Sequence, residues 1–131
     1  MSVTRAPAWQ SWTEKEWLEQ VRKLASQLGW LTYHPHQSQR SEPGFPDLTL
    51  VRERVVFVEL KRHAASSKLS PHQELWRDRL LAAGAEHYVW RPADADNIIR
   101  ILGKRRPVQV QYVGHPIGAE TPGQSPTPGR A

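Results

Sequence analysis

The sequence of 131 residues contains no cysteine, so neither a disulfide framework nor a thiolate zinc site can form. It also has no apolar run long enough to span a bilayer, and its first residues, MSVTRAPAWQSWTEKEW, lack the apolar core of a signal peptide. These absences exclude a disulfide-stabilised secreted domain and predict a soluble protein of the cytoplasm. The length suits one compact domain.

Basic residues outnumber acidic ones, 18 to 13, which gives a formal charge of +5 and a pI near 10.0. A basic protein favours an acidic partner such as nucleic acid. The excess is concentrated near the C-terminus, because residues 104–131 contain four lysines or arginines and a single glutamate. Residues 1–103 therefore carry a net charge of only +2. Charge alone is weak support for a nucleic-acid groove.

Periodicity and turn residues predict alternating helices and strands. A first helix is expected after Thr13, because Glu16 completes a capping box and apolar residues recur at helical spacing. A second helix is expected after Ser70, and a third near residues 93–103. Strands are expected where β-branched and aromatic residues concentrate, at residues 30–34, 47–51, 55–60 and 86–90. This order predicts an α/β fold with a mixed sheet flanked by helices.

The domain is expected to span residues 13–103, followed by a basic Pro/Gly-rich tail over residues 104–131. The tail contains VQVQYV, which could form an edge strand, but its remainder has the composition of a flexible segment. The strand at residues 55–60, VVFVEL, is almost continuously apolar, and this predicts burial on both of its faces.

Three charged residues interrupt the predicted hairpin of residues 47–60. Glu59 and Lys61 share one face of their strand, about 7 Å apart, and Asp47 can lie beside them at the start of the partner strand. A buried carboxylate is costly unless it is paired or binds a metal. Such a cluster could hold Mg²⁺ or Mn²⁺ through oxygen ligands, with the lysine orienting water or stabilising charge on a phosphate. The alternative is a salt-bridged sheet end, with Glu59 paired to Lys61 and Asp47 capping a turn.

Several motifs resemble, in this order, the VRR-NUC family, the virus-type replication and repair nucleases: GW, YHPHQSQRSEPGFPDL, VELKR, LSPHQELW and YVWRPAD. GFPDLTLV followed by VVFVELK is similar to the signature of the wider PD-(D/E)XK nuclease superfamily. The resemblance covers residues 13–103. It implies an α/β nuclease core and metal-dependent cleavage of DNA, often branched DNA. Small stand-alone members occur in phages and bacteria and are dimeric, which implies a homodimer in the bacterial or host cytoplasm.

The resemblance also implies the roles of individual residues. Asp47 and Glu59 would be metal ligands, together with the main-chain carbonyl of Leu60, and Lys61 would position the attacking water. Glu14 would complete the site directly or through water. The residues themselves give an independent reason for this last choice. At about 100° per residue, Glu14 points close to the apolar stripe of its helix, whereas Glu16 and Glu19 point away from it.

Supporting residues are expected on a helix and in two loops. Gln73 matches a family glutamine near the catalytic lysine and could orient water or phosphate; the alternative is a solvent-exposed helix residue. The following residues Leu75, Trp76 and Leu80 are expected in the core. Four side chains are expected to contact the DNA backbone: Ser38, Arg40, Arg62 and Lys68. The alternative for the charged ones is that they are only solvated. The family's Ser-Arg pair is interrupted here by Gln39. His34 and His36 are expected to be structural or to contact DNA.

These inferences predict a Mg²⁺- or Mn²⁺-dependent, structure-specific DNA endonuclease that could resolve four-way junctions. One alternative is a DNA-binding or assembly module without catalysis, which the complete set of expected catalytic side chains argues against. Another is a flap or restriction-type nuclease, and so short a chain leaves little room for a recognition domain. A two-fold homodimer would supply two sites for the paired cuts of a junction. Candidate interface residues are Trp9, Trp12 and residues 34–40.

Overall fold

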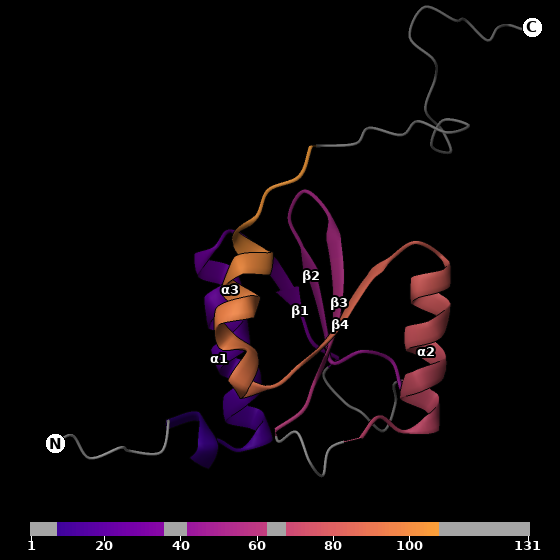
Figure 1. Ribbon diagram of the computed structural model, residues 1–131, viewed down its shortest axis with the longest axis horizontal. Coiled ribbons are helices and arrows are strands. Elements are labelled where there is room, and N and C mark those ends of the chain that lie inside the picture. Colours follow the sequence, from indigo (N-terminus) through magenta and orange to yellow (C-terminus); the bar gives the residue numbers. More distant parts are fainter. Residues whose placement is uncertain (1–7, 36–41, 63–67, 108–131) are drawn as a thin grey trace, which may run out of the picture.

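The computed structural model describes residues 8–35, 42–62 and 68–107 (Figure 1). The predicted order of helices and strands is confirmed. Along the chain the elements are η1 (Ala8–Ser11), α1 (Glu14–Gln27), β1 (Leu31–Tyr33), β2 (Leu48–Val51), β3 (Val55–Leu60), α2 (Pro71–Ala82), β4 (Glu86–Trp90), η3 (Pro92–Asp94) and α3 (Ala95–Gly103). Within these ranges, no helix is long and apolar enough to cross a membrane.

The four strands form one mixed sheet in the order β1-β2-β3-β4. The first two pairings are antiparallel, and β3 pairs with β4 in parallel. Helix α2 connects these two parallel strands. Figure 1 shows α1 and α3 together on one side of the sheet and α2 on the other. The predicted α/β architecture, a mixed sheet flanked by helices, is therefore confirmed.

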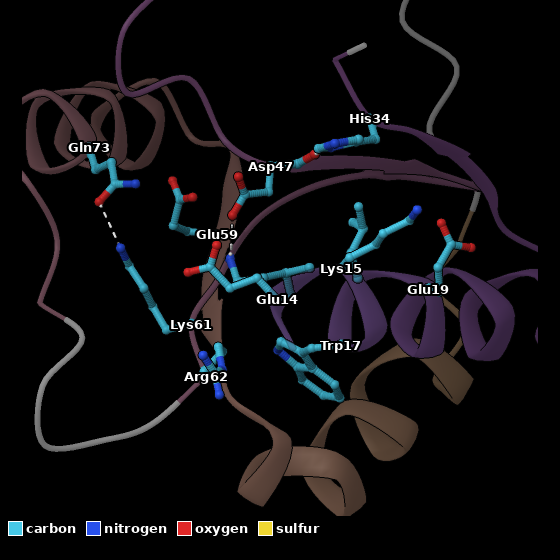
Figure 2. Close-up of a pocket in the computed structure, with 12 residues that line it drawn as sticks. Glu14, Lys15, Trp17, Glu19, His34, Asp47, Glu59, Lys61, Arg62 and Gln73 are labelled. Carbon is cyan, nitrogen blue, oxygen red and sulfur yellow. Dashed lines mark hydrogen bonds between the residues drawn. The ribbon is translucent and has the colours of Figure 1, made fainter. Parts of the chain in front are cut away.

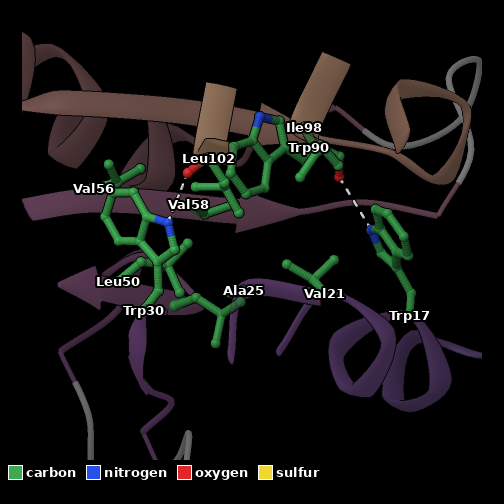
Figure 3. Packing of buried hydrophobic residues seen from close by; sticks show 11 residues of the cluster. Trp17, Val21, Ala25, Trp30, Leu50, Val56, Val58, Trp90, Ile98 and Leu102 are labelled. Atoms are coloured by element: carbon green, nitrogen blue, oxygen red, sulfur yellow. Dashed lines mark hydrogen bonds between the residues drawn. The ribbon is translucent and has the colours of Figure 1, made fainter. Parts of the chain in front are cut away.

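The hydrophobic core lies between the sheet and the pair α1 and α3 (Figure 3). Two tryptophan side chains connect these layers through polar contacts as well as packing. The indole N–H of Trp30 donates to the Leu102 carbonyl at 3.0 Å, and that of Trp17 donates to the Trp90 carbonyl at 3.2 Å. The buried hydrophobic side chains are Trp17, Val21, Ala25, Trp30, Leu48, Leu50, Val56, Val58, Trp90, Ile98 and Leu102.

The opposite face of the sheet is only partly covered, which corrects the expectation for β3. Val56 and Val58 are fully buried, but Val55 is exposed and Phe57 is half-buried, so the strand alternates in burial. Among the described residues, α2 packs mainly against β4 on this face, and Val51 and Val55 remain exposed. Leu31 of β1 is 75% exposed.

Helices α1 and α2 both begin with a complete capping box. In α1, the Glu16 N–H donates to Thr13 Oγ1 at 3.0 Å and Thr13 N–H donates to Glu16 Oε1 at 2.8 Å, as predicted. In α2, Ser70 is the predicted N-cap, and Gln73 provides the reciprocal bond, which was not anticipated. Each box satisfies backbone donors that a helix N-terminus otherwise leaves unpaired.

One expectation about hydrophobic residues is wrong, and another stays a prediction. Leu75 is 50% exposed and α2 has no buried residue, because this helix packs mainly against β4, the edge strand of the sheet. Trp12 stays a candidate interface residue: it is half-buried, packs against the core, and its ring stacks on that of Trp17 with centroids 5.8 Å apart. The side chain of Trp9 and all of residues 36–41 lie outside the described residues, as does the tail beyond residue 107.

The turn between β2 and β3, Arg52–Arg54, ties the two core helices to the sheet. Arg52 donates to the Leu28 carbonyl after α1, and Arg54 donates to the Ile101 carbonyl in α3, each at 2.9 Å. Both guanidinium groups lie over the Trp30 ring. Glu53 joins them, and its hydrogen bond with Arg52 holds the pKa of its carboxyl group far below the usual range. At this end of the sheet, each charged side chain of the turn therefore has an oppositely charged partner.

Candidate active site

The charged residues of the hairpin meet at the other end of the sheet. Asp47 directly precedes β2, Glu59 is near the end of β3, and Lys61 follows that strand. Because Leu48 pairs with Val58, Asp47 lies opposite Glu59. All three border a cavity of about 480 Å³ (Figure 2). The residues lining this cavity are Glu14, Lys15, Trp17, Leu18, Glu19, His34, Asp47, Glu59, Leu60, Lys61, Arg62 and Gln73.

Asp47 and Glu59 form a carboxyl pair in the cavity wall. Glu59 is only 2% exposed, and Oδ2 of Asp47 accepts the Leu60 N–H at 2.8 Å. Burial, and then the hydrogen bond and charge of Asp47, raise the pKa of Glu59 to about 9, against the opposing charge of Lys61. Two adjacent carboxyl groups cannot both ionise cheaply, so the pair retains a proton at neutral pH unless a cation binds.

Lys61 is held by an amide rather than by a carboxylate. Its Nζ donates to Gln73 Oε1 at 3.1 Å, and the same oxygen accepts the Ser70 N–H at 2.8 Å. Among the ion pairs of the described residues, none joins Lys61 to Glu59, so the salt-bridged sheet end is not formed. With its oxygen engaged by two donors, Gln73 presents its amide nitrogen on the side of Asp47, as Figure 2 shows.

The first turn of α1 forms another wall. Glu14 is exposed and lines the cavity, and Figure 2 shows its side chain directed toward Asp47 and Glu59. Glu16 does not line the cavity, because its carboxylate is part of the capping box. Glu19, which the helical wheel separates from Glu14, also borders the cavity, one helical turn after Lys15. The cavity therefore follows a helix face beside the core stripe rather than the stripe itself.

The donor set suits a hard divalent cation. Within the described residues, no three His, Asp or Glu side chains are grouped closely enough to share a metal ion. The candidate ligands are thus two carboxylates, Asp47 and Glu59, with the Leu60 carbonyl between Glu59 and Lys61. Mg²⁺ typically uses one or two carboxylates and keeps several waters, so this set fits it, and Glu14 would act through water. The buried Glu59 carboxyl gives a physical reason for binding a cation.

The predicted DNA contacts are distributed unequally around the cavity. Arg62 lines it, and its Nε is buried without a hydrogen-bond partner, so this donor is available to an acceptor. Lys68 is exposed and does not line the cavity. Ser38 and Arg40 lie outside the described residues.

Lys15 was not predicted from the sequence, whereas His34 was expected to be structural or to contact DNA. Lys15 follows Glu14 on α1 and lines the cavity. It does so because the cavity lies beside the apolar stripe of the helix, and the sequence does not indicate this position. His34 Nδ1 lies 2.7 Å from the Asp47 main-chain oxygen. Because a carbonyl oxygen only accepts, this nitrogen carries the proton and His34 supports the backbone of Asp47. No sequence motif signals this contact, since it depends on the pairing of β1 with β2.

Solved structures provide the comparison with known proteins. One, described as a VRR_NUC domain, is 27% identical and superimposes with a TM-score of 0.55 over 66% of this chain and 94% of its own. A second, a VRR_NUC domain protein, is 20% identical, with a TM-score of 0.56 over 70% of this chain and 85% of its own, which supports the fold. No family model matches the sequence, and no match is found among curated proteins. In fold, and at 27% identity to the first of these structures, the chain is similar to VRR_NUC domain proteins, which are PD-(D/E)XK-like.

Proposed function

We propose that the protein is a metal-dependent DNA endonuclease that cuts branched substrates as a homodimer in the bacterial or host cytoplasm. The similarity of the fold to VRR_NUC domain proteins supports the reaction class. The observation that carries the proposal is the carboxyl pair Asp47 and Glu59 facing one cavity with a lysine fixed by Gln73. A cavity with this combination of acids and cations matches what phosphodiester hydrolysis requires, which is neutralisation of the phosphate and a positioned water.

The acidic residues would hold the cofactor. Asp47, Glu59 and the Leu60 carbonyl would bind Mg²⁺ or Mn²⁺ directly, and Glu14 would do so through water. When bound, the metal supplies Lewis acidity toward a phosphate oxygen. Asp47 is well placed for this task because two contacts fix it: Leu60 N–H holds one carboxylate oxygen and His34 holds its main-chain oxygen.

The cationic and amide groups would act on the phosphate and the water. Lys61 donates to Gln73 through one of its three N–H bonds, so the others remain to orient a water molecule or stabilise charge on a phosphate oxygen. The amide nitrogen of Gln73 can donate to the same phosphate. Arg62 and Lys15 border the cavity and would contact neighbouring phosphates of the backbone.

The nuclease unit in this proposal is residues 13–103. A chain of this size has one cavity of this kind among its described residues, whereas resolving a four-way junction requires two symmetric cuts. A two-fold dimer would supply both sites. The resemblance to dimeric stand-alone family members supports this part of the proposal.

The test is incubation of the purified protein with Mg²⁺ or Mn²⁺ and a panel of duplex, flap, splayed and four-way DNA. We expect cleavage that EDTA abolishes and that Asp47→Ala and Glu59→Ala eliminate without unfolding the protein. Asp78→Ala, which removes an exposed carboxylate from α2, is the matched control and should cleave normally. Cutting retained by Asp47→Ala in Mn²⁺ would overturn the assignment of the site.

Assembly is tested separately by light scattering and by the products from a mobile four-way junction. The proposal expects a dimer at micromolar concentration and paired incisions that give nicked duplexes. A strict monomer that trims only flaps or single-stranded ends would exclude junction resolution while leaving the nuclease assignment intact. Binding to DNA without cleavage under every metal condition would favour the non-catalytic module.

A further inference from the structure

The loop before Asp47 approaches the start of α2 more closely than a side chain would permit. Gly44 has φ +84°, and a Cβ built on it would lie 2.4 Å from the carbonyl carbon of His72 and 2.7 Å from the backbone nitrogen of Gln73. Both atoms belong to the helix backbone, so no side-chain rotation could relieve the contact. Glycine is therefore required here for space as well as for its backbone conformation.

Two further contacts hold this loop against the same helix. The indole N–H of Trp76 donates to the Pro43 carbonyl at 3.1 Å. The ring of Phe45 meets that of Trp76 edge-on, with centroids 5.0 Å apart, and meets Phe57 of β3 in the same manner at 6.1 Å. Three consecutive loop residues are thus docked on α2, and one of them is also docked on the sheet.

The docked loop continues to the carboxyl pair, and the docked turn of α2 contains the glutamine that holds Lys61. Asp47 follows Gly44 by three residues, and Gln73, whose backbone nitrogen faces Gly44, holds the ammonium group of Lys61. We infer that Gly44 and Trp76 are positioning residues, which set the separation between the carboxyl pair and the Lys61–Gln73 pair. The catalytic consequence rests on the proposed function; the positioning contact itself does not.

The structure gives a magnitude for the effect of Gly44→Ala. Restoring an ordinary carbon–carbon contact from 2.4 Å requires the loop and the first turn of α2 to separate by about 1 Å, and a displacement of this size can lower a catalysed rate about 100-fold. Phosphate contacts elsewhere on the protein are unchanged. The loss should therefore appear in kcat, with KM for DNA nearly unaffected.

Gly84→Ala provides a matched control. Gly84 has φ +86°, almost the same as Gly44, but a Cβ there would have no neighbour within 4 Å. Both variants introduce alanine at a left-handed position, and only Gly44→Ala forces α2 and the loop apart. Trp76→Phe is the milder test of the same docking, because it keeps an aromatic ring, although a smaller one, and removes the hydrogen bond to Pro43.

The experiment uses the full chain and two readouts. The first is cleavage with saturating metal, in which Gly44→Ala should lose about 100-fold in kcat, Trp76→Phe less, and Gly84→Ala almost nothing. The second is the NMR signal of the Gln73 side-chain amide, identified by its loss in Gln73→Glu. We expect this signal to shift in Gly44→Ala and in Trp76→Phe and to stay in place in Gly84→Ala.

An unchanged Gln73 signal in Gly44→Ala, or equal kcat for Gly44→Ala and Gly84→Ala, would overturn the inference. If the wild-type protein cleaves no DNA, the proposed function fails, and the amide signal still decides whether Gly44 positions Gln73. If Gly44→Ala does not fold, Trp76→Phe carries the test alone, and a Gln73 signal that it leaves unmoved refutes the inference.

Discussion

Replacing Glu59 by glutamine tests whether this buried carboxyl group keeps its proton when metal is absent. Burial and Asp47 raise its pKa from 4.5 to about 9 in the folded protein. Between these pH values the unfolded chain releases a proton that the folded protein retains. The stabilisation is thus complete below pH 4.5 and is lost as pH rises toward 9, at up to about 1.4 kcal/mol per pH unit.

Glutamine resembles the protonated carboxyl group in shape and has no proton to lose. In EDTA, the wild-type free energy of unfolding should fall by up to about 2.7 kcal/mol between pH 6 and pH 8 through this group, and Glu59→Gln should lack that slope. Urea unfolding followed by tryptophan fluorescence measures both curves. Adding Mg²⁺ should stabilise the wild type more at pH 8 than at pH 6, because the cation must displace the proton.

Glu19→Gln is the control, since it neutralises an exposed carboxyl group bordering the same cavity. Its curve in EDTA should run parallel to that of the wild type. If Glu59→Gln also runs parallel to the wild type from pH 6 to pH 8, Glu59 is ionised in the metal-free protein. Burial would then not control its charge, and the reasoning would be refuted.

Three other changes have expected outcomes. Glu14→Gln should impair cleavage far more than Glu16→Gln, because only Glu14 faces the carboxyl pair; equal rates would contradict this. Lys61→Ala should abolish cleavage while thermal melting stays close to that of the wild type, and retained cutting would remove Lys61 from the mechanism. Arg54→Ala should lower the free energy of unfolding by about 2 kcal/mol or more through its lost hydrogen bonds. Arg77→Ala removes a half-exposed arginine paired only with the exposed Asp78 and should cost less than about 1 kcal/mol; equal losses in urea unfolding would refute the special role of Arg54.

Local signals in the sequence were sufficient to predict most elements of the fold. The capping box of Thr13 and Glu16 predicted the start of α1, and the polar turn between residues 51 and 55 predicted the hairpin. The burial of α2 was mispredicted, because apolar residues such as Leu75 identify a helix but not the layer that covers it. Coverage depends on where the crossover from β3 to β4 places α2, and no short window of sequence contains that information.

In the candidate site, too, the features set by local sequence could be predicted and those set by contacts between distant elements could not. The juxtaposition of Asp47 and Glu59 could be predicted because hairpin register is local, and strand periodicity put Lys61 on the same face. The contacts that orient these groups are not local. His34 reaches Asp47 through a neighbouring strand, and Gln73 serves at once as capping residue and as acceptor for Lys61. Each depends on a distance between elements, which a sequence pattern does not specify.

The two ends of the sheet differ in how their charges are compensated. At the turn end, Arg52 and Arg54 surround Glu53 and lie over Trp30, so every charge of the turn has a partner. At the cavity end, Glu59 is buried beside another acid, and this arrangement is unfavourable until a cation binds. Folding therefore does not require the cavity end to be paired. The acids can remain there without a cationic partner because the core helices are held at the opposite end, and this leaves the acids free to bind metal.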